Sequence, residues 1–179
     1  MILDAVVPLL AEYGSDLTSR QIAEGAGIAE GTVFRAFGDK DTLLRAAAEQ
    51  YFDEAVVLDE LHAIDPAADL ESKLVQVLTL MHRRFQGALR VMSALGDSRP
   101  AEHAEQDAAA SRLIERLFAA DAARLAWTPE QLMHLVRLLA FASSVPEIAA
   151  SDAPFTNEQL AHILVRGVRT PSAVGGSDA

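Results

Sequence analysis

Cysteine is absent from this sequence of 179 residues, which excludes disulfide bonds, thiolate metal sites and cysteine nucleophiles. No apolar run approaches the roughly 18–20 residues that a membrane-spanning helix needs. The opening segment, MILDAVVPLLAEYG, has no basic stretch and carries Asp4, so it does not fit a secretory signal. We therefore expect a cytoplasmic protein with no membrane partner.

Basic side chains are also scarce, because 15 lysines and arginines stand against 26 acidic residues, for a net charge of −11. Proteins that hold nucleic acid through bulk electrostatics are usually basic. The balance of charge excludes a generic nucleic-acid binder. Any DNA binding must come from a local arrangement of side chains.

What is present is a composition typical of helices. Half of the residues are hydrophobic, alanine and leucine are abundant, and alternation of β-branched residues is hard to find. The pattern predicts an all-α protein of about nine helices, with one long helix over 40–64 and another over 68–95 that Gly87 could interrupt. Short helices before about residue 38 give way to long ones after it. We expect a helix-turn-helix domain over 1–45, a helical effector-binding and dimerisation domain over 46–170, and a disordered tail over 171–179.

The segment 18–37 has the features of two short helices joined by a tight turn. Thr18 and Gln21 have the spacing of a capping box, and Gly27 can adopt the positive φ that the turn needs. Ala23 is small where the two helices would cross. Ile22, Ile28 and Val33 can fill the wedge between them. This is the packing requirement of a helix-turn-helix, whose second helix can enter a DNA major groove.

These residues and their neighbours resemble the N-terminal domain of the TetR family of transcriptional regulators. The resemblance covers residues 2–44 and is carried by ILDA, LTSRQIAEGAGI, GTVFRAF and DKDTLL. The long helices that follow match the family in layout, with a variable ligand-binding domain whose last two helices pair two subunits. The resemblance implies a homodimer that reads a pseudo-palindromic operator in double-stranded DNA.

The same resemblance implies roles for single residues. Those at the start of the second helix and of the fourth would contact phosphate, and the third helix would lie in the groove. The DNA-binding set is Thr18, Ser19, Arg20, Glu30, Gly31, Thr32, Val33, Phe34, Arg35 and Lys40.

Several positions depart from the family's usual residues. The family often has Ser, Lys, Tyr and His where this sequence has Ala29, Glu30, Phe34 and Ala36. The basic segment that usually precedes the first helix is not in this sequence. Glu30 either repels phosphate or accepts a hydrogen bond from a cytosine amino group.

The charges between Thr18 and Arg45 also cancel. Four of them are basic (Arg20, Arg35, Lys40, Arg45) and four are acidic (Glu24, Glu30, Asp39, Asp41). The predicted reading surface is therefore neutral.

The second domain offers a candidate pocket and a candidate dimer face. Bulky or polarizable residues on aliphatic helices could hold an apolar or amphipathic effector, or simply form core. This pocket set is Met81, His82, Phe85, Met92, Phe118 and Trp127. Two stripes near the end could pair two subunits as a four-helix bundle, or face the core of their own subunit. They comprise Leu132, Leu135, Val136, Leu139, Ala142, Leu160, Ile163, Leu164 and Gly167.

No catalytic motif stands out, so we expect no enzyme, and we expect no cofactor. His103 with Asp107, and Glu158 with His162, have the spacing of metal ligands, but two ligands do not make a site, and we expect no metal. The sequence favours a ligand-responsive regulator of transcription, most simply a repressor. The alternative is a dimeric ligand- or protein-binding module of the same fold with little or no DNA binding.

Overall fold

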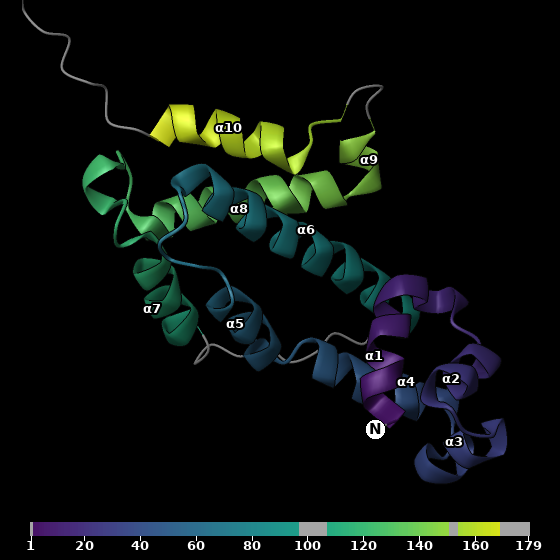
Figure 1. Cartoon of the computed structure of the whole chain (residues 1–179). Coiled ribbons are helices and arrows are strands. Elements are labelled where there is room, and N and C mark those ends of the chain that lie inside the picture. Colours follow the sequence, from purple (N-terminus) through teal and green to yellow (C-terminus); the bar gives the residue numbers. More distant parts are fainter. Residues whose placement is uncertain (1, 97–106, 151–153, 169–179) are drawn as a thin grey trace, which may run out of the picture. The chain divides into compact units, whose positions relative to one another are not determined.

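The computed structural model describes residues 2–96, 107–150 and 154–168 (Figure 1). Every regular element in these ranges is helical, which confirms the all-α prediction. The helices are α1 (Ile2–Tyr13), α2 (Ser19–Ala26), α3 (Glu30–Phe37), α4 (Lys40–Tyr51), α5 (Glu54–His62), α6 (Leu70–Leu95), α7 (Asp107–Phe118), α8 (Pro129–Ser144), α9 (Pro146–Ala149) and α10 (Asn157–Val168), with 3-10 turns at Gly14–Asp16 and Ala122–Arg124. Within the described ranges, none of the helices has the length and apolarity to cross a membrane.

The chain divides into two compact units, and the division is not a single cut. Unit 1 comprises residues 1–59 with 82–106, and unit 2 comprises 60–81 with 107–179. The expected boundary at residues 45 and 46 therefore falls inside unit 1. Helix α6 contributes its first half to unit 2 and its second half to unit 1. The expected tail over 171–179 lies outside the described residues.

Unit 1 has a core of aliphatic side chains from α1, α2, α3 and α4, completed by the second half of α6. Val6, Leu10, Ile22 and Leu43 are fully buried, and so is Val91 of α6. The second half of α6 is therefore part of the hydrophobic core beneath the helix-turn-helix.

The prediction of one long helix over 40–64 is wrong, because the chain breaks between α4 and α5. In an unbroken helix the carbonyl of Tyr51 would accept from the amide of Ala55. The Tyr51 carbonyl instead accepts from Nη2 of Arg84 at 2.6 Å, and the Ala55 amide donates to Oδ1 of Asp53 at 3.0 Å. Both groups of the missing helical bond thus have other partners.

Helix α6, in contrast, runs through Gly87 without a break. A Cβ placed at Gly87 would lie 2.2 Å from Oη of Tyr51 and 3.2 Å from Cβ of Ala11. The Tyr51 hydroxyl donates to the carbonyl of Arg84 at 2.8 Å, and Cζ of Arg84 lies 4.3 Å from the centroid of the Tyr51 ring. Glycine at this position allows α6 to approach α1 and α4 closely.

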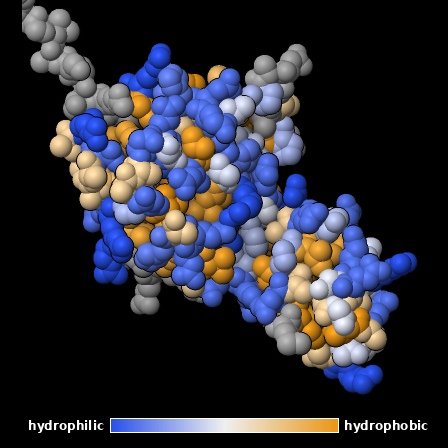
Figure 2. Space-filling model, viewed as in Figure 1, coloured by the Kyte–Doolittle hydropathy of each residue, from blue (hydrophilic) through white to orange (hydrophobic). Residues whose placement is uncertain are grey.

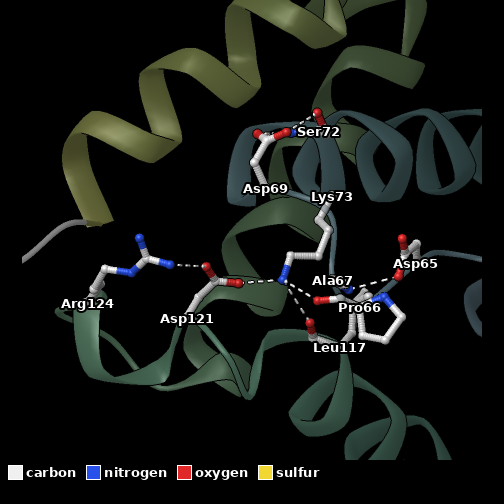
Figure 3. Close-up of polar contacts among 9 residues, drawn as sticks. All are labelled: Asp65, Pro66, Ala67, Asp69, Ser72, Lys73, Leu117, Asp121 and Arg124. Carbon is white, nitrogen blue, oxygen red and sulfur yellow. Dashed lines mark hydrogen bonds and ion pairs between the residues drawn. The ribbon is translucent and has the colours of Figure 1, made fainter.

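Unit 2 contains a buried ion pair between Lys73 and Asp121 (Figure 3). The ammonium of Lys73 donates to a carboxylate oxygen of Asp121, and to the carbonyls of Pro66 and Leu117 at 3.1 Å each. The side chains of Lys73 and Asp121 are 1% and 5% exposed. The second carboxylate oxygen of Asp121 accepts from Arg124 at 3.4 Å. The buried charge thus has three acceptors, which join the start of α6 to the end of α7 and to the turn before α6.

Helix α10 is joined to α6 within unit 2 by polar contacts. Asn157 Nδ2 donates to Thr79 Oγ1 at 3.1 Å, and Nδ1 of His162 lies 3.1 Å from Oε1 of Glu71. The visible surface in Figure 2 mixes hydrophilic residues with smaller hydrophobic areas. Several large apolar side chains are exposed on α8 to α10 and just before α10, namely Leu138, Phe141, Ile148, Phe155 and Ile163.

Candidate nucleic-acid interface

The start of α2 is fixed by the capping box that the sequence predicts. The amide of Gln21 donates to Oγ1 of Thr18 at 3.3 Å, and the amide of Thr18 donates to Oε1 of Gln21 at 2.9 Å. Thr18 and Arg20 are exposed, and Ser19 is half-buried. Three of the residues expected to contact phosphate therefore lie at the capped start of one helix.

The turn between α2 and α3 also has the predicted geometry. Gly27 has φ +66°, in the left-handed region where glycine is favoured, and the amide of Ile28 donates to the carbonyl of Ala23 at 3.1 Å. Ile22 and Ala23 are buried and Ile28 packs on the same core. These contacts fix the orientation of α3 relative to α2.

One side of α3 faces the core of unit 1 and the other faces outward. Val33 is 1% exposed and belongs to the core. Its expected contact with the groove is therefore corrected, because a side chain held in the wedge between α2 and α3 cannot also reach a base. Its other expected role, filling that wedge, is confirmed.

The outward side of α3 carries the remaining candidates. Glu30, Gly31, Thr32 and Arg35 are exposed, and Phe34 is half-buried. Ala29, the residue before the helix, makes no side-chain capping bond, as expected for alanine. The exposed residues at 30–32 and 35 form one surface, which we call the α3 face.

The electrostatics around the α3 face are balanced by local pairing. Nε of Arg20 donates to Oε1 of Glu24 at 2.8 Å, and this hydrogen bond raises the pKa of Arg20. Asp39 caps α4 by accepting from the amide of Thr42 at 2.7 Å, which lowers the pKa of the Asp39 carboxyl. Lys40, at the first position of α4, is half-buried. Two of the acidic side chains are thus engaged with groups of the protein.

The predicted pocket residues do not share one environment. His82, Phe85 and Met92 belong to unit 1, whereas Met81, Phe118 and Trp127 belong to unit 2. The ring of Phe118 is 1% exposed and lies 5.6 Å below the ammonium of Lys73, so it is core. Met92 and Trp127 are exposed at 36% and 39%. An effector site made of these six residues stays a prediction.

Unit 2 has a hollow that the sequence did not indicate. It is lined by Leu61, His62, Ile64, Pro66, Leu113, Arg116 and Leu117. Two of these, Pro66 and Leu117, have carbonyls that accept hydrogen bonds from the ammonium of Lys73. No periodic pattern could have found it, because its wall combines α5, α7 and the turn before α6.

The predicted dimer stripes are partly core of their own subunit, the alternative that the sequence left open. Four of them are buried (Leu132, Val136, Leu160 and Leu164), so their expected place at an interface is corrected. Leu135, Leu139 and Ala142 are half-buried, and Ile163 and Gly167 are exposed. Sequence reasoning missed Leu138 and Phe141, which lie on the exposed side of α8. On α8, the exposed side therefore lies a few positions away from the predicted stripe.

Among the described residues, no three histidine, cysteine, aspartate or glutamate side chains gather as a metal site would require. His162 lies against Glu71 rather than forming a site with Glu158. His103 lies outside the described residues.

Comparison with known proteins agrees with this geometry. Residues 2–47 match the model of the family described as bacterial regulatory proteins, tetR family. No curated protein matches the chain.

Solved structures match over nearly the whole chain. The TetR transcriptional regulator SCO0520 from Streptomyces coelicolor is 22% identical, with a TM-score of 0.61 over 96% of this chain and 98% of that one. The superantigen PfiT gives 18% identity and a TM-score of 0.54 over 96% and 95%. The regulator AibR, solved in complex with isovaleryl coenzyme A and operator DNA, gives 18% identity and a TM-score of 0.50 over 93% and 95%. At these identities the likeness concerns the fold.

Proposed function

Residues 2–47 of this chain belong to the tetR family of bacterial regulatory proteins, and on that premise we propose that the protein is a ligand-responsive regulator of transcription. It binds a pseudo-palindromic operator in double-stranded DNA as a homodimer, acts in the cytoplasm, and is most simply a repressor. Its work is binding rather than catalysis.

The observation that carries the proposal is the α3 face. A rigid capped helix, a tight turn and a buried wedge present Thr32 and Arg35 outward. An exposed helix of this kind fits a major groove, with base contacts from its outer side chains. Phosphate contacts come from Thr18, Ser19, Arg20 and Lys40, with α2 and α4 presenting their positive ends.

Pairing of two subunits is supported by the apolar surface of unit 2. Leu138 of α8 and Ile163 of α10 are 53% and 51% exposed, and Phe141 is 44% exposed. Large exposed apolar side chains grouped on two helices of one unit favour association with a second copy. A dimer presents two α3 faces, which a pseudo-palindromic site requires.

An effector, apolar or amphipathic in character, binds in the second domain. Within unit 2 the candidates are Met81 and Trp127 from the predicted set, together with the hollow beside Arg116. AibR has an acyl-coenzyme A bound together with its operator, which supports an organic effector for this fold. The effector acts by population shift, because it favours a separation of the two α3 faces that no longer fits successive major grooves.

A second candidate is a dimeric module of this fold with little or no DNA binding. The neutral charge of residues 18–45 favours it, since each missing cation removes a phosphate contact. The fold does not decide between the two, because a superantigen is among the similar structures and one fold hosts unrelated functions.

Selection from random duplex DNA with the full chain tests the proposal. We expect one enriched motif with two related halves. We expect Lys40→Ala to weaken binding to all sequences alike and to reduce the slope of log affinity against log salt by about 1 per subunit. Affinity at several salt concentrations measures both effects.

Arg112→Ala is the matched control, since Arg112 is an exposed cation on α7 in unit 2. It removes the same charge but should leave the salt slope unchanged. If no motif is enriched even at low salt, the second candidate replaces the first.

A further inference from the structure

Glu30 is an exposed carboxylate at the first position of α3, and no part of the described structure uses it. It makes no hydrogen bond or ion pair through its side chain within the described residues. Glu24 and Asp39, in contrast, are engaged with Arg20 and with the amide of Thr42. Glu30 is therefore available to an outside partner.

The surroundings of Glu30 leave room for that partner. Gly31 has helical backbone angles, and a Cβ placed there would meet nothing within 4 Å. Thr32 is small and exposed, while Val33 anchors the opposite side of the helix in the core. The first turn of α3 thus offers one carboxylate beside a glycine with open space at its missing Cβ, where another molecule can approach the backbone closely.

The chemistry of duplex DNA restricts what such a carboxylate can contact. Phosphates repel it. In the major groove, guanine presents only acceptors, and adenine places an acceptor, N7, next to its amino group. Cytosine presents a donor, the N4 amino group, to which a carboxylate is the matching acceptor. Of the four bases, cytosine therefore suits Glu30 best.

We propose that Glu30 is a specificity-determining residue that accepts a hydrogen bond from the N4 amino group of one cytosine in each half-site. The inference rests on the proposed function, because it needs α3 in the major groove. Glu30 lowers the general affinity for DNA because phosphates repel its carboxylate. It also lowers the affinity further for sequences without cytosine at the contacted position, which makes binding more specific.

The test compares the DNA motifs selected by the full chain and by its Glu30→Ala and Glu30→Gln variants, followed by affinities on single-site changes. We expect the wild-type motif to contain a required cytosine, and replacement of that cytosine by thymine to reduce wild-type affinity on the order of tenfold. Glu30→Ala should lose this discrimination and keep the rest of the motif. Glu30→Gln should weaken it, because a neutral amide is a poorer acceptor.

Glu49→Ala is the matched control, an exposed acidic residue on α4 of the same unit. It removes the same charge and should keep the cytosine requirement. A circular dichroism melt of each variant shows that the fold is retained.

Four results would overturn the inference. A motif without a required cytosine, or one whose cytosine requirement survives Glu30→Ala, removes the contact while leaving the proposed function intact. Equal tightening of Glu30→Ala on all sequences would mean that Glu30 only repels phosphate. If the wild-type chain enriches no motif at all, the proposed function fails as well.

Discussion

Two glycines show how differently one residue type can be used in this protein. Gly87 of α6 is buried against Tyr51 and Ala11, and Gly31 of α3 is exposed with empty space at its missing Cβ. In an exposed helix, alanine is favoured over glycine. At Gly87 that preference is opposed by overlap with the Tyr51 hydroxyl.

We expect Gly87→Ala to destabilise unit 1 by about 1–3 kcal/mol, the usual cost of overpacking a filled core. The cause is the 2.2 Å approach of the new methyl group to Oη of Tyr51. Urea unfolding followed by circular dichroism measures the change.

Gly31→Ala is the control for backbone propensity, and it should leave stability unchanged or raise it, since no neighbour is displaced. With α3 in a groove, the same change should weaken DNA binding because the added methyl group keeps a base edge away. If the Gly87→Ala variant is as stable as the wild type, α6 does not approach Tyr51 as closely as the structure shows.

At this scale the sequence predicted the local contacts well. The capping box of Thr18 and Gln21, the left-handed Gly27 and the burial of Ile22 depend on residues a few positions apart, which a sequence displays directly. Val33 marks the limit. The family resemblance predicted that Val33 contacts the DNA groove, and the packing argument predicted that it fills the wedge between α2 and α3. The structure shows that Val33 is buried in that wedge.

Among the elements, the contact of α6 with α7 depends on one buried charge. Lys73 is surrounded by Asp121 and two carbonyls, so its loss leaves a buried carboxylate without its closest partner. We expect Lys73→Met to destabilise the protein by about 3–5 kcal/mol, the usual cost of breaking a buried pair. Urea unfolding measures this loss.

Arg124→Ala tests the exposed side of the same carboxylate. The Arg124 side chain is 74% exposed, and its removal should cost at most about 1 kcal/mol because solvent screens the pair. Lys73→Met combined with Asp121→Leu should recover much of the loss, since neither charge then stays buried alone. Equal effects of Lys73→Met and Arg124→Ala would contradict the burial of the pair.

The break between α4 and α5 shows why element boundaries were harder to predict. Residues 40–64 form helices on both sides of the break, and hydrophobic periodicity alone would join them into one helix. Arg84, which takes the carbonyl of Tyr51, lies 33 positions along the chain. Contacts of that kind are set by tertiary structure.

For the whole molecule, we expect the exposed apolar side chains of unit 2 to set the state of assembly. We expect Leu138→Glu with Ile163→Glu to convert a dimer into a monomer, because both side chains are about half exposed and would place four charges in one interface. Light scattering after gel filtration measures the mass in solution.

Val56→Glu serves as the control, since Val56 is 41% exposed but lies on α5 in unit 1. It should leave the mass unchanged. A wild-type chain that is already monomeric at micromolar concentration, or a double variant that stays dimeric, would place the interface elsewhere.

The sequence anticipated the exposed Ile163 of α10, but on α8 it pointed to the wrong side of the helix. Leu132 and Val136 are as apolar as Leu138, and nothing in their spacing says which belongs to the core. The pocket was harder still. Its six candidates are divided between two units whose composition depends on the path of α6.

That path has a consequence for how such proteins can exchange parts. The segment matched by the family ends at residue 47, yet the core beneath it is completed by Tyr51 and by Val91, far along the chain. A helix-turn-helix segment transplanted at that boundary would lack the core residues of α6, and its aliphatic side chains would be exposed to water. Exchange of this segment between related proteins, by recombination or by design, should give a folded product only when residues 82–96 are transferred together with residues 1–59.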